Sequence, residues 1–215
     1  MMNRFSILLL PLRRLFVRLL RWPKRYGFGT HSPFAYRLIT DVISEHTPYY
    51  NYSALRKEEQ RLGTSDLPKG CCRETLQMKR LLYRLVNFVQ PTNTLSVGCP
   101  TTSRLYLSAA KQGMNFWHAS SLDELFLDAG EPVDFLYLHD VNNPGLLRQA
   151  FELCAERTTP QSLFVVQGIG YTPQMRRLWR EFQGDARVVV TFDLFDFGLL
   201  FFDPSKQRQH YKVCI

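Results

Sequence analysis

The sequence predicts an α/β fold in which helices cover both faces of a mainly parallel sheet. Between residues 94 and 202, short apolar runs rich in β-branched and aromatic residues alternate with segments of helical periodicity. The last two apolar runs are joined by only residues 193–197, too few for a parallel crossover, so we expect that pair to be antiparallel. The chain has 215 residues, 45% apolar and 21% charged, which suits one domain with an extension and excludes wholesale disorder.

The N-terminal segment is predicted to be an amphipathic helix with a basic face. On a helical wheel, the leucines and phenylalanines of residues 5–20 fall within one sector of about 140°, and the arginines share the opposite side. Pro11 either begins this helix or kinks it. We predict no membrane span, because no stretch of about 18 residues is free of charge. We also predict no secretory signal peptide, because the apolar run is short and lacks a small-residue cleavage site.

The net charge of +8 is concentrated in this N-terminal arm. Residues 1–40 hold eight basic residues and no acid, which leaves 19 basic residues against all 19 acidic ones in the rest of the chain. Any anionic partner should therefore bind residues 1–25, and an anionic membrane surface is one such partner. Two other interpretations stay open: the apolar face packs on the protein's own core while the arginines are solvated, or the segment is a transit peptide or a nucleic-acid arm. We do not expect a nucleic-acid partner, since no recognition motif or aromatic interleaving supports one.

The segment up to residue 70 is predicted to continue as a helical extension that leads into the main domain. Ser32 and Pro33 are typical of a helix N-cap and first turn, so a helix should run to about Ser44. Residues 63–70 are rich in glycine and small polar residues and should form a loop. We place a domain boundary there, dividing the chain into residues 1–70 and 71–215. A further helix is expected from Glu74 to Val89, before Pro91.

The main domain is predicted to contain six strands and three further helices. The strands are expected at residues 94–97, 115–119, 133–138, 162–166, 187–192 and 198–202, and the helices at residues 103–111, 145–157 and 174–182.

A series of short motifs runs along the chain from residue 31 onward. They are His31–Phe34 (H-S-P-F), Leu95–Gly98 at the first strand, Tyr137–Asp140 at a later strand, Gln167–Met175, and Phe192–Phe195 followed by Gly198–Phe202. In this order they resemble the class I S-adenosylmethionine (SAM) dependent methyltransferases, closest to a bacterial O-methyltransferase-like group that begins with an H-S-P-F segment. The resemblance covers about residues 27–215 and implies a Rossmann-like methyltransferase fold with an antiparallel C-terminal pair.

The sequence departs from this family where the cofactor would bind. The resemblance implies a carboxylate and then Gly-x-x-x-Gly at the end of the first strand; here Ser96 takes the place of the acid, Gly98 is kept, and Pro100 removes a backbone N–H. The second strand, which includes His118, offers no acid for the ribose hydroxyls. Ser96, Gly98 and His118 are therefore cofactor-binding candidates by position only. Residues 121–132 are too few for a crossover helix and a third strand, so we expect the sheet to lack one strand.

The catalytic residues are not identified by the sequence, and no metal site is expected. The resemblance places an Asp-Asp pair where this chain has Gln167 and Gly168, which are poor ligands for a hard cation. Asp140, His139 and His31 are weak catalytic candidates, because histidines and strand-end acids act as general bases or ligands in other sites.

These departures lead to a hypothesis about function. We expect a methyltransferase-like domain that has lost catalysis and serves as a scaffold or interaction domain, with no cofactor. The alternative is an active SAM-dependent O-methyltransferase with an atypical cofactor loop, for which SAM would be the cofactor. Some other use of the same cleft also stays open.

The cysteines point to a reducing compartment. Five are present, an odd number, at positions 71, 72, 99, 154 and 214, with no C-x-x-C pair, so we predict neither a disulfide framework nor a zinc site. We therefore expect a cytoplasmic protein, with peripheral membrane association through residues 1–25 as a further expectation.

Overall fold

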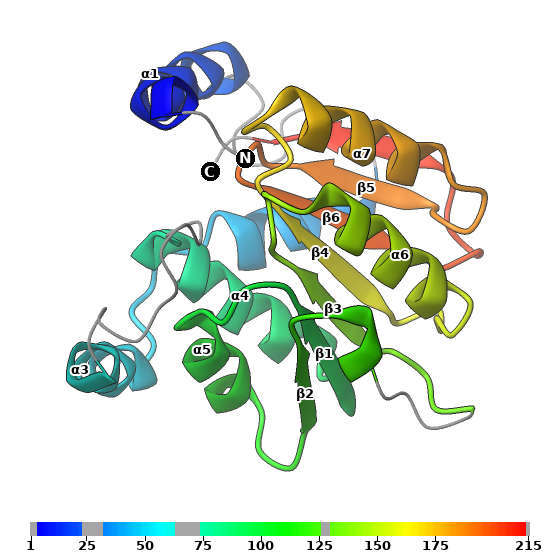
Figure 1. The fold of residues 1–215 in the computed structure, drawn as a ribbon, viewed down its shortest axis with the longest axis horizontal. Helices are drawn as coiled ribbons and strands as arrows, with labels where there is room; N and C mark the ends of the chain where they lie inside the picture. The colour runs from blue at the N-terminus through cyan, green and yellow to red at the C-terminus, as the bar shows by residue number, and fades with distance from the viewer. Residues whose placement is uncertain (1–3, 23–31, 63–73, 126–129, 214–215) are drawn as a thin grey trace.

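The computed structural model describes residues 4–22, 32–62, 74–125 and 130–213, arranged around one mixed sheet (Figure 1). The strand order is β2-β1-β3-β4-β6-β5-β7. β6 runs antiparallel to both neighbours, β4 and β5, and every other pair is parallel. The predicted α/β class and its antiparallel C-terminal pair are thus confirmed. The strands are β1 (Asn93–Val97), β2 (Asn115–Ala119), β3 (Phe135–Leu138), β4 (Leu163–Gln167), β5 (Val190–Asp193), β6 (Phe197–Phe201) and β7 (Gln209–Lys212).

Helices cover both faces of this sheet (Figure 1). Alternate residues of each central strand point to opposite sides, so that in β3 Leu136 packs in one core cluster while Phe135 and Tyr137 pack in the other. The first cluster lies under α6 (Pro144–Ala155) and α7 (Pro173–Gly184). The second lies under α2 (Pro33–Arg37), a π-helical turn η2 (Leu38–Ile43), α4 (Leu76–Val89) and α5 (Ser103–Ala110).

The predicted helix from Ser32 to Ser44 forms, but it changes its hydrogen-bonding pattern halfway. Ser32 caps α2, and the chain then widens into η2, whose end is marked by the bond from Ser44 N to Ile39 O at 2.8 Å. A further helix, α3 (Asn51–Leu62), was not predicted. The predicted loop and domain boundary at residues 63–70 lie outside the described residues.

In the chain between β2 and β3, where we expect one strand to be lost, the described residues form no strand. Among the described residues there, only the short 3₁₀ turn η3 (Leu122–Glu124) has regular structure, and β2 stands at the edge of the sheet. The opposite edge carries β7, a strand that the sequence did not predict.

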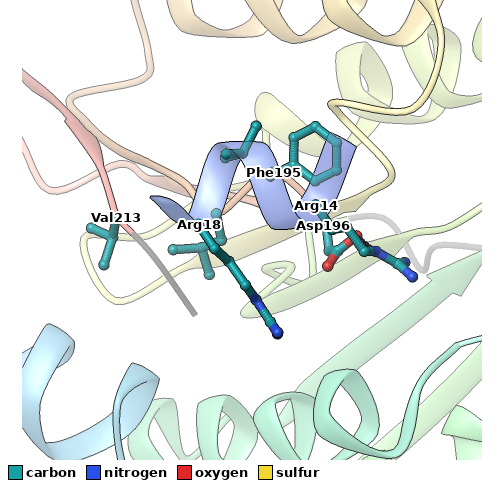
Figure 2. A pocket seen from close by; sticks show the side chains of 7 residues that line it. Arg14, Arg18, Phe195, Asp196 and Val213 are labelled. Carbon is teal, nitrogen blue, oxygen red and sulfur yellow. Dashed lines mark hydrogen bonds and ion pairs between the residues drawn. The ribbon is translucent and has the colours of Figure 1, made fainter. Parts of the chain in front are cut away.

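The predicted N-terminal helix forms as α1 (Arg4–Arg21), and Pro11 lies inside it and does not begin it. Arg13, Arg14 and Arg21 hydrogen-bond to the body of the protein, and Figure 2 shows Arg14 beside Asp196. From Leu9 onward, where side-chain burial is described, most of the apolar side chains of α1 are exposed. The interpretation in which this apolar face packs on the core while the arginines are solvated is therefore wrong. Among the described helices, none has the length and apolarity needed to cross a bilayer.

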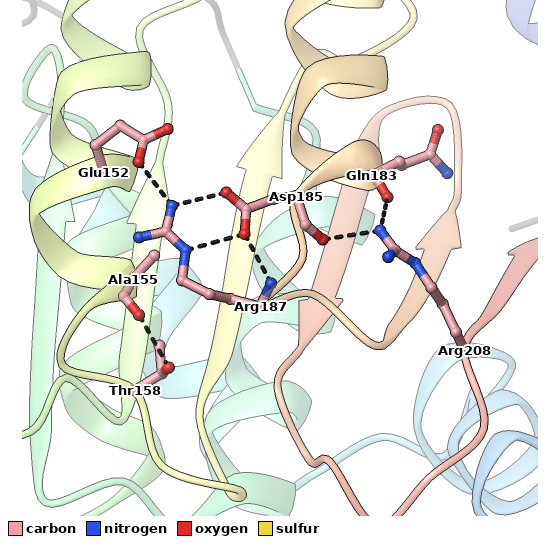
Figure 3. A network of polar contacts seen from close by, with 7 residues as sticks. All are labelled: Glu152, Ala155, Thr158, Gln183, Asp185, Arg187 and Arg208. Atoms are coloured by element: carbon pink, nitrogen blue, oxygen red, sulfur yellow. Dashed lines mark hydrogen bonds and ion pairs between the residues drawn. The ribbon is translucent and has the colours of Figure 1, made fainter.

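Polar contacts join the end of α7 to its neighbours (Figure 3). Arg187 bonds to Asp185 and, at 2.6 Å, to Glu152 of α6. Arg208, just before β7, donates to the carbonyls of Gln183 and Asp185 at 2.9 and 2.8 Å. These carbonyls lie at the C-terminal end of α7, so a cation there satisfies acceptors that the helix leaves open.

Candidate functional site

The ends of β1 and β3 meet closely at Gly98. This residue has φ +136°, and a Cβ at this position would lie 2.8 Å from the backbone nitrogen of Asp140 and 3.1 Å from the carbonyl carbon of His139. Gly98 N also donates to Ala119 O at the end of β2, at 2.9 Å. The sequence therefore needs glycine here for a positive φ and for the close approach of another backbone. As a result, three carboxyl strand ends converge at one point.

Ser96 and His118, two of the predicted site residues, belong to a series of polar contacts beside Gly98. The Ser96 hydroxyl lies 2.8 Å from His139 Nε2 and 3.4 Å from His118 Nδ1. His118 Nε2 is in turn 3.4 Å from the Ser120 hydroxyl. The structure thus brings together Ser96, Gly98, His118 and His139, which come from β1, β2, β3 and the turns that follow them.

His139 is a neutral, buried hydrogen-bonding residue. It is 2% exposed, and burial, with a smaller effect of nearby His118, lowers the pKa of His139 to about 3. Burial also lowers the pKa of His118, which is half-buried. A group with a pKa near 3 is a weak base at neutral pH, so the burial of His139 argues against its acting as a general base. Its Nδ1 is buried and has no hydrogen-bond partner.

The other two catalytic candidates are not joined to this polar chain by a described contact. The carboxylate of Asp140 accepts a hydrogen bond from Asn142 N at 3.1 Å, a local contact that shapes the turn after β3. Its backbone nevertheless lies against Gly98, so Asp140 stands at the converging strand ends. His31 lies outside the described residues.

Two acids that sequence reasoning missed hold the loop after β1. Glu74 accepts hydrogen bonds from the hydroxyls of Ser103 and Tyr137, and burial of its carboxylate raises its pKa. Glu59 of α3 accepts from the Thr102 hydroxyl at 3.1 Å. Thr102 and Ser103 begin α5, so both acids lie at the positive end of a helix dipole. A lone Glu in a polar segment gives no sequence signal of this role.

The end of β4 differs from the acidic pair that the resemblance implies. The Gln167 side chain is buried, with Oε1 3.2 Å from the Tyr137 hydroxyl and no partner for Nε2. Gly168 has φ +69°, and a Cβ there would lie 2.7 Å from Val141. Within the described ranges, no three His, Cys, Asp or Glu residues are placed to hold a metal ion.

The cysteines partly contradict the sequence analysis. Cys99, directly after Gly98, is disulfide-bonded, a bond that the prediction of no disulfide framework did not foresee. Cys154 is a free, buried thiol, and burial raises its pKa to about 12. A thiol with so high a pKa is unreactive at neutral pH.

Comparison with known proteins finds the likeness in structure and not in sequence. No protein-family model matches the chain, and no curated protein matches it significantly. The SAM complex of the O-methyltransferase TomG from Streptomyces achromogenes, involved in tomaymycin synthesis, is 16% identical with a TM-score of 0.50, covering 73% of this chain and 91% of that one. The methyltransferase PaMTH1 of Podospora anserina, bound to S-adenosylhomocysteine (SAH), is 9% identical with a TM-score of 0.51, covering 81% and 97%.

These two structures overturn one prediction. The expectation that the chain has no cofactor is wrong, since both of these solved structures are complexes with SAM or with SAH. The strand order, the antiparallel β6 and these likenesses agree. The chain therefore has the fold of the class I SAM-dependent methyltransferases.

Proposed function

We propose that this chain binds SAM at the carboxyl ends of β1, β2 and β3. The observation that carries the proposal is the convergence of these strand ends at Gly98. In the strand order, β2 and β3 lie on opposite sides of β1, so the chain direction across the sheet reverses there. Open α/β sheets bind their ligands in the crevice at such a switch point.

The polar groups at this edge fit an adenosyl ligand. His118 lies near the end of β2 and Ser120 follows it, at the position from which ribose hydroxyls are reached. A neutral imidazole and a hydroxyl can each exchange hydrogen bonds with these hydroxyls. The backbone turn at Gly98 leaves the amino-acid part of the ligand close to the main chain. Ser96 is already bonded to His139, so it is not the substitute for the family's carboxylate. The unpartnered Nδ1 of His139 is a further polar group at this edge.

The donor set at the end of β4 favours binding without metal-assisted catalysis. Bound SAM would supply an electrophilic methyl group. Metal-assisted methyl transfer to a hydroxyl needs hard oxygen ligands that hold a divalent cation. Gln167 offers only an amide oxygen that already accepts a bond from Tyr137, and Gly168 has no side chain to offer a ligand. The proposed function is therefore a SAM-binding interaction domain that does not turn over by this route.

An active O-methyltransferase is the second candidate. One observation favours it: Asp140 is a carboxylate at the end of β3, beside Gly98, where it could accept a proton or bind a cation. The bond from Asn142 N does not exclude this role, because a carboxylate that accepts one hydrogen bond keeps further acceptor sites.

Calorimetric titration with SAM and with SAH tests the binding proposal. We expect saturable binding in the micromolar range, equivalent to about 8 kcal/mol. His118→Ala should weaken binding at least tenfold, because it removes a polar contact at the ribose position. His210→Ala, which changes a histidine on the opposite sheet edge, should leave binding unchanged. Absence of heat with both ligands would contradict the proposal.

Turnover distinguishes the two candidates. SAH release is measured with phenolic and catecholic acceptors, with and without Mg²⁺. The interaction-domain proposal predicts no release under either condition. Acceptor-dependent release that Asp140→Asn abolishes, with SAM binding retained, would instead establish the enzyme.

A further inference from the structure

Helix α1 contacts the body through its arginines. Arg13 donates to the carbonyls of Gly170 and Tyr171, both at 3.1 Å, and Arg14 pairs with Asp196 at 2.8 Å. Two turns further along, Arg21 pairs with Asp193 at 2.8 Å. These ion pairs are partly shielded from solvent, with each arginine side chain less than a quarter exposed. The basic face of the amphipathic helix is therefore turned inward.

The apolar face of α1 is consequently turned outward. Among the apolar side chains of α1 whose burial is described, from Leu9 onward, only Leu10 is buried and Val17 half-buried against the core. Seven large apolar side chains are between 41% and 65% exposed: Leu9, Leu12, Leu15, Phe16, Leu19, Leu20 and Trp22. Contiguous apolar patches of more than a few hundred Å² are rare on monomeric proteins and mark interaction sites. Two aromatic side chains alone, at this exposure, leave roughly 100–150 Å² each accessible.

The charge of the segment selects an anionic bilayer as the occupant. Residues 1–25 hold seven basic residues and no acid. A two-fold dimer through this face would bring two basic segments together, since Asp193 and Asp196 pair with only two of the seven basic residues of each copy. An anionic lipid surface instead complements this charge, and leucine, phenylalanine and tryptophan beside arginine are the composition of interfacial helices.

We propose that the outward face of α1 inserts into the interfacial region of an anionic bilayer while its arginines hold the helix on the body. The 18-residue helix is about 27 Å long, so it would lie flat along the surface. Apolar insertion is the main attraction, because Arg14 and Arg21 are neutralised by Asp196 and Asp193. Arg13 donates to backbone carbonyls, which do not neutralise it, and its charge adds the preference for acidic lipid.

Co-sedimentation with vesicles tests the proposal on the full chain. Vesicles of phosphatidylcholine with one-third phosphatidylglycerol are compared with pure phosphatidylcholine, at low and high salt. We expect the wild type to bind the acidic vesicles, and to bind less tightly but still measurably in high salt, since salt screens charge but not apolar insertion. Equal binding to both lipids would remove the anionic part of the proposal.

A matched pair of triple variants isolates the apolar face. The variant Leu12→Gln, Phe16→Gln and Leu20→Gln should lose at least tenfold in vesicle affinity. The control Leu62→Gln, Phe88→Gln and Leu153→Gln makes the same substitutions at exposed apolar positions elsewhere and should bind as the wild type does. Melting curves of both variants check that the fold is kept.

Two further readouts decide between outcomes. Lipids brominated in their acyl chains should quench Trp22 fluorescence, and Trp22→Phe should remove that quenching. If the first triple variant binds vesicles like the wild type, the proposal is overturned. It is also overturned if the wild type ignores vesicles and instead forms a dimer in solution that this variant abolishes.

Discussion

At the scale of single residues, the candidate site depends on backbone contact as much as on side chains. The sequence predicts a role for Gly98, because this glycine directly follows an apolar strand. It also predicts that the strand ends converge, since parallel strands end at one edge of the sheet. The bond between Ser96 and His139 was not predictable, because it depends on the register of β1 against β3, which local sequence does not specify. The contacts of Glu74 were hidden for a similar reason: they join segments 27 to 63 residues apart.

Substitution of Gly98 tests the close approach at this site. Gly98→Ala should destabilise the fold by more than about 1 kcal/mol, since the new Cβ meets the Asp140 backbone and a positive φ is itself unfavourable. Gly113→Ala is the control: its φ is +70°, but nothing lies within 4 Å of a Cβ there. Urea unfolding of both variants separates the two effects, and equal losses would show that the contact at position 98 carries no cost.

At the scale of elements, the sequence predicted those with strong periodicity and missed those without it. The strands with buried apolar runs, such as β3 and β4, were found because every position in them is buried. β7 (Gln209–Lys212) was missed because it is a short, polar edge strand. α3 was missed because only Tyr52 and Leu55 of its twelve residues are buried, too few to show a period.

The π-helical turn η2 depends on one buried arginine. Arg84 of α4 donates from Nε to Val42 O at 2.6 Å and from Nη2 to Ile43 O at 3.4 Å, which satisfies carbonyls at the end of the turn. Arg84→Leu should cost about 1–3 kcal/mol, because buried carbonyls lose their donors. Arg37→Leu should change stability by less than about 0.5 kcal/mol, since its ion pair with Asp41 is solvent-exposed. Chemical unfolding of the two variants measures this; a loss at Arg84 no larger than that at Arg37 would refute the capping role.

At the scale of the whole molecule, the buried histidine links folding to pH. His139 has a pKa of about 3 in the folded protein and about 6.5 when unfolded. Between these values the unfolded chain takes up a proton that the folded protein does not, so stability falls as the pH is lowered through this window. Glu74 acts in the opposite direction above its ordinary pKa, since its folded pKa is raised. The effect of the histidine must therefore be isolated by substitution.

Wild type and His139→Gln should respond differently to acid. The glutamine can keep a hydrogen bond to Ser96 but cannot take up a proton when unfolded. The free energy of unfolding of the wild type should fall, relative to that of the variant, by up to about 1.4 kcal/mol per pH unit between pH 6 and pH 4. Urea titrations at pH 7, 6, 5 and 4 provide the measurement. Parallel pH curves would mean that His139 titrates alike in the folded and unfolded states.

The described residues between β2 and β3 in the chain form no strand, and this affects how the protein can associate with itself. No described residue pairs with the outer side of β2, so Asn115–Ala119 presents unpaired backbone donors and acceptors at the sheet edge. Such an edge is a template for adding a strand from another chain. Ala119 is buried, and the other residues of the strand are at least partly exposed. None of them is Lys, Arg, Asp or Glu, whose charge would hinder such pairing, and Phe116 and Trp117 add aromatic surface to the strand. Under partial unfolding, aggregation should therefore begin at β2 and not at β7, whose edge carries Lys212.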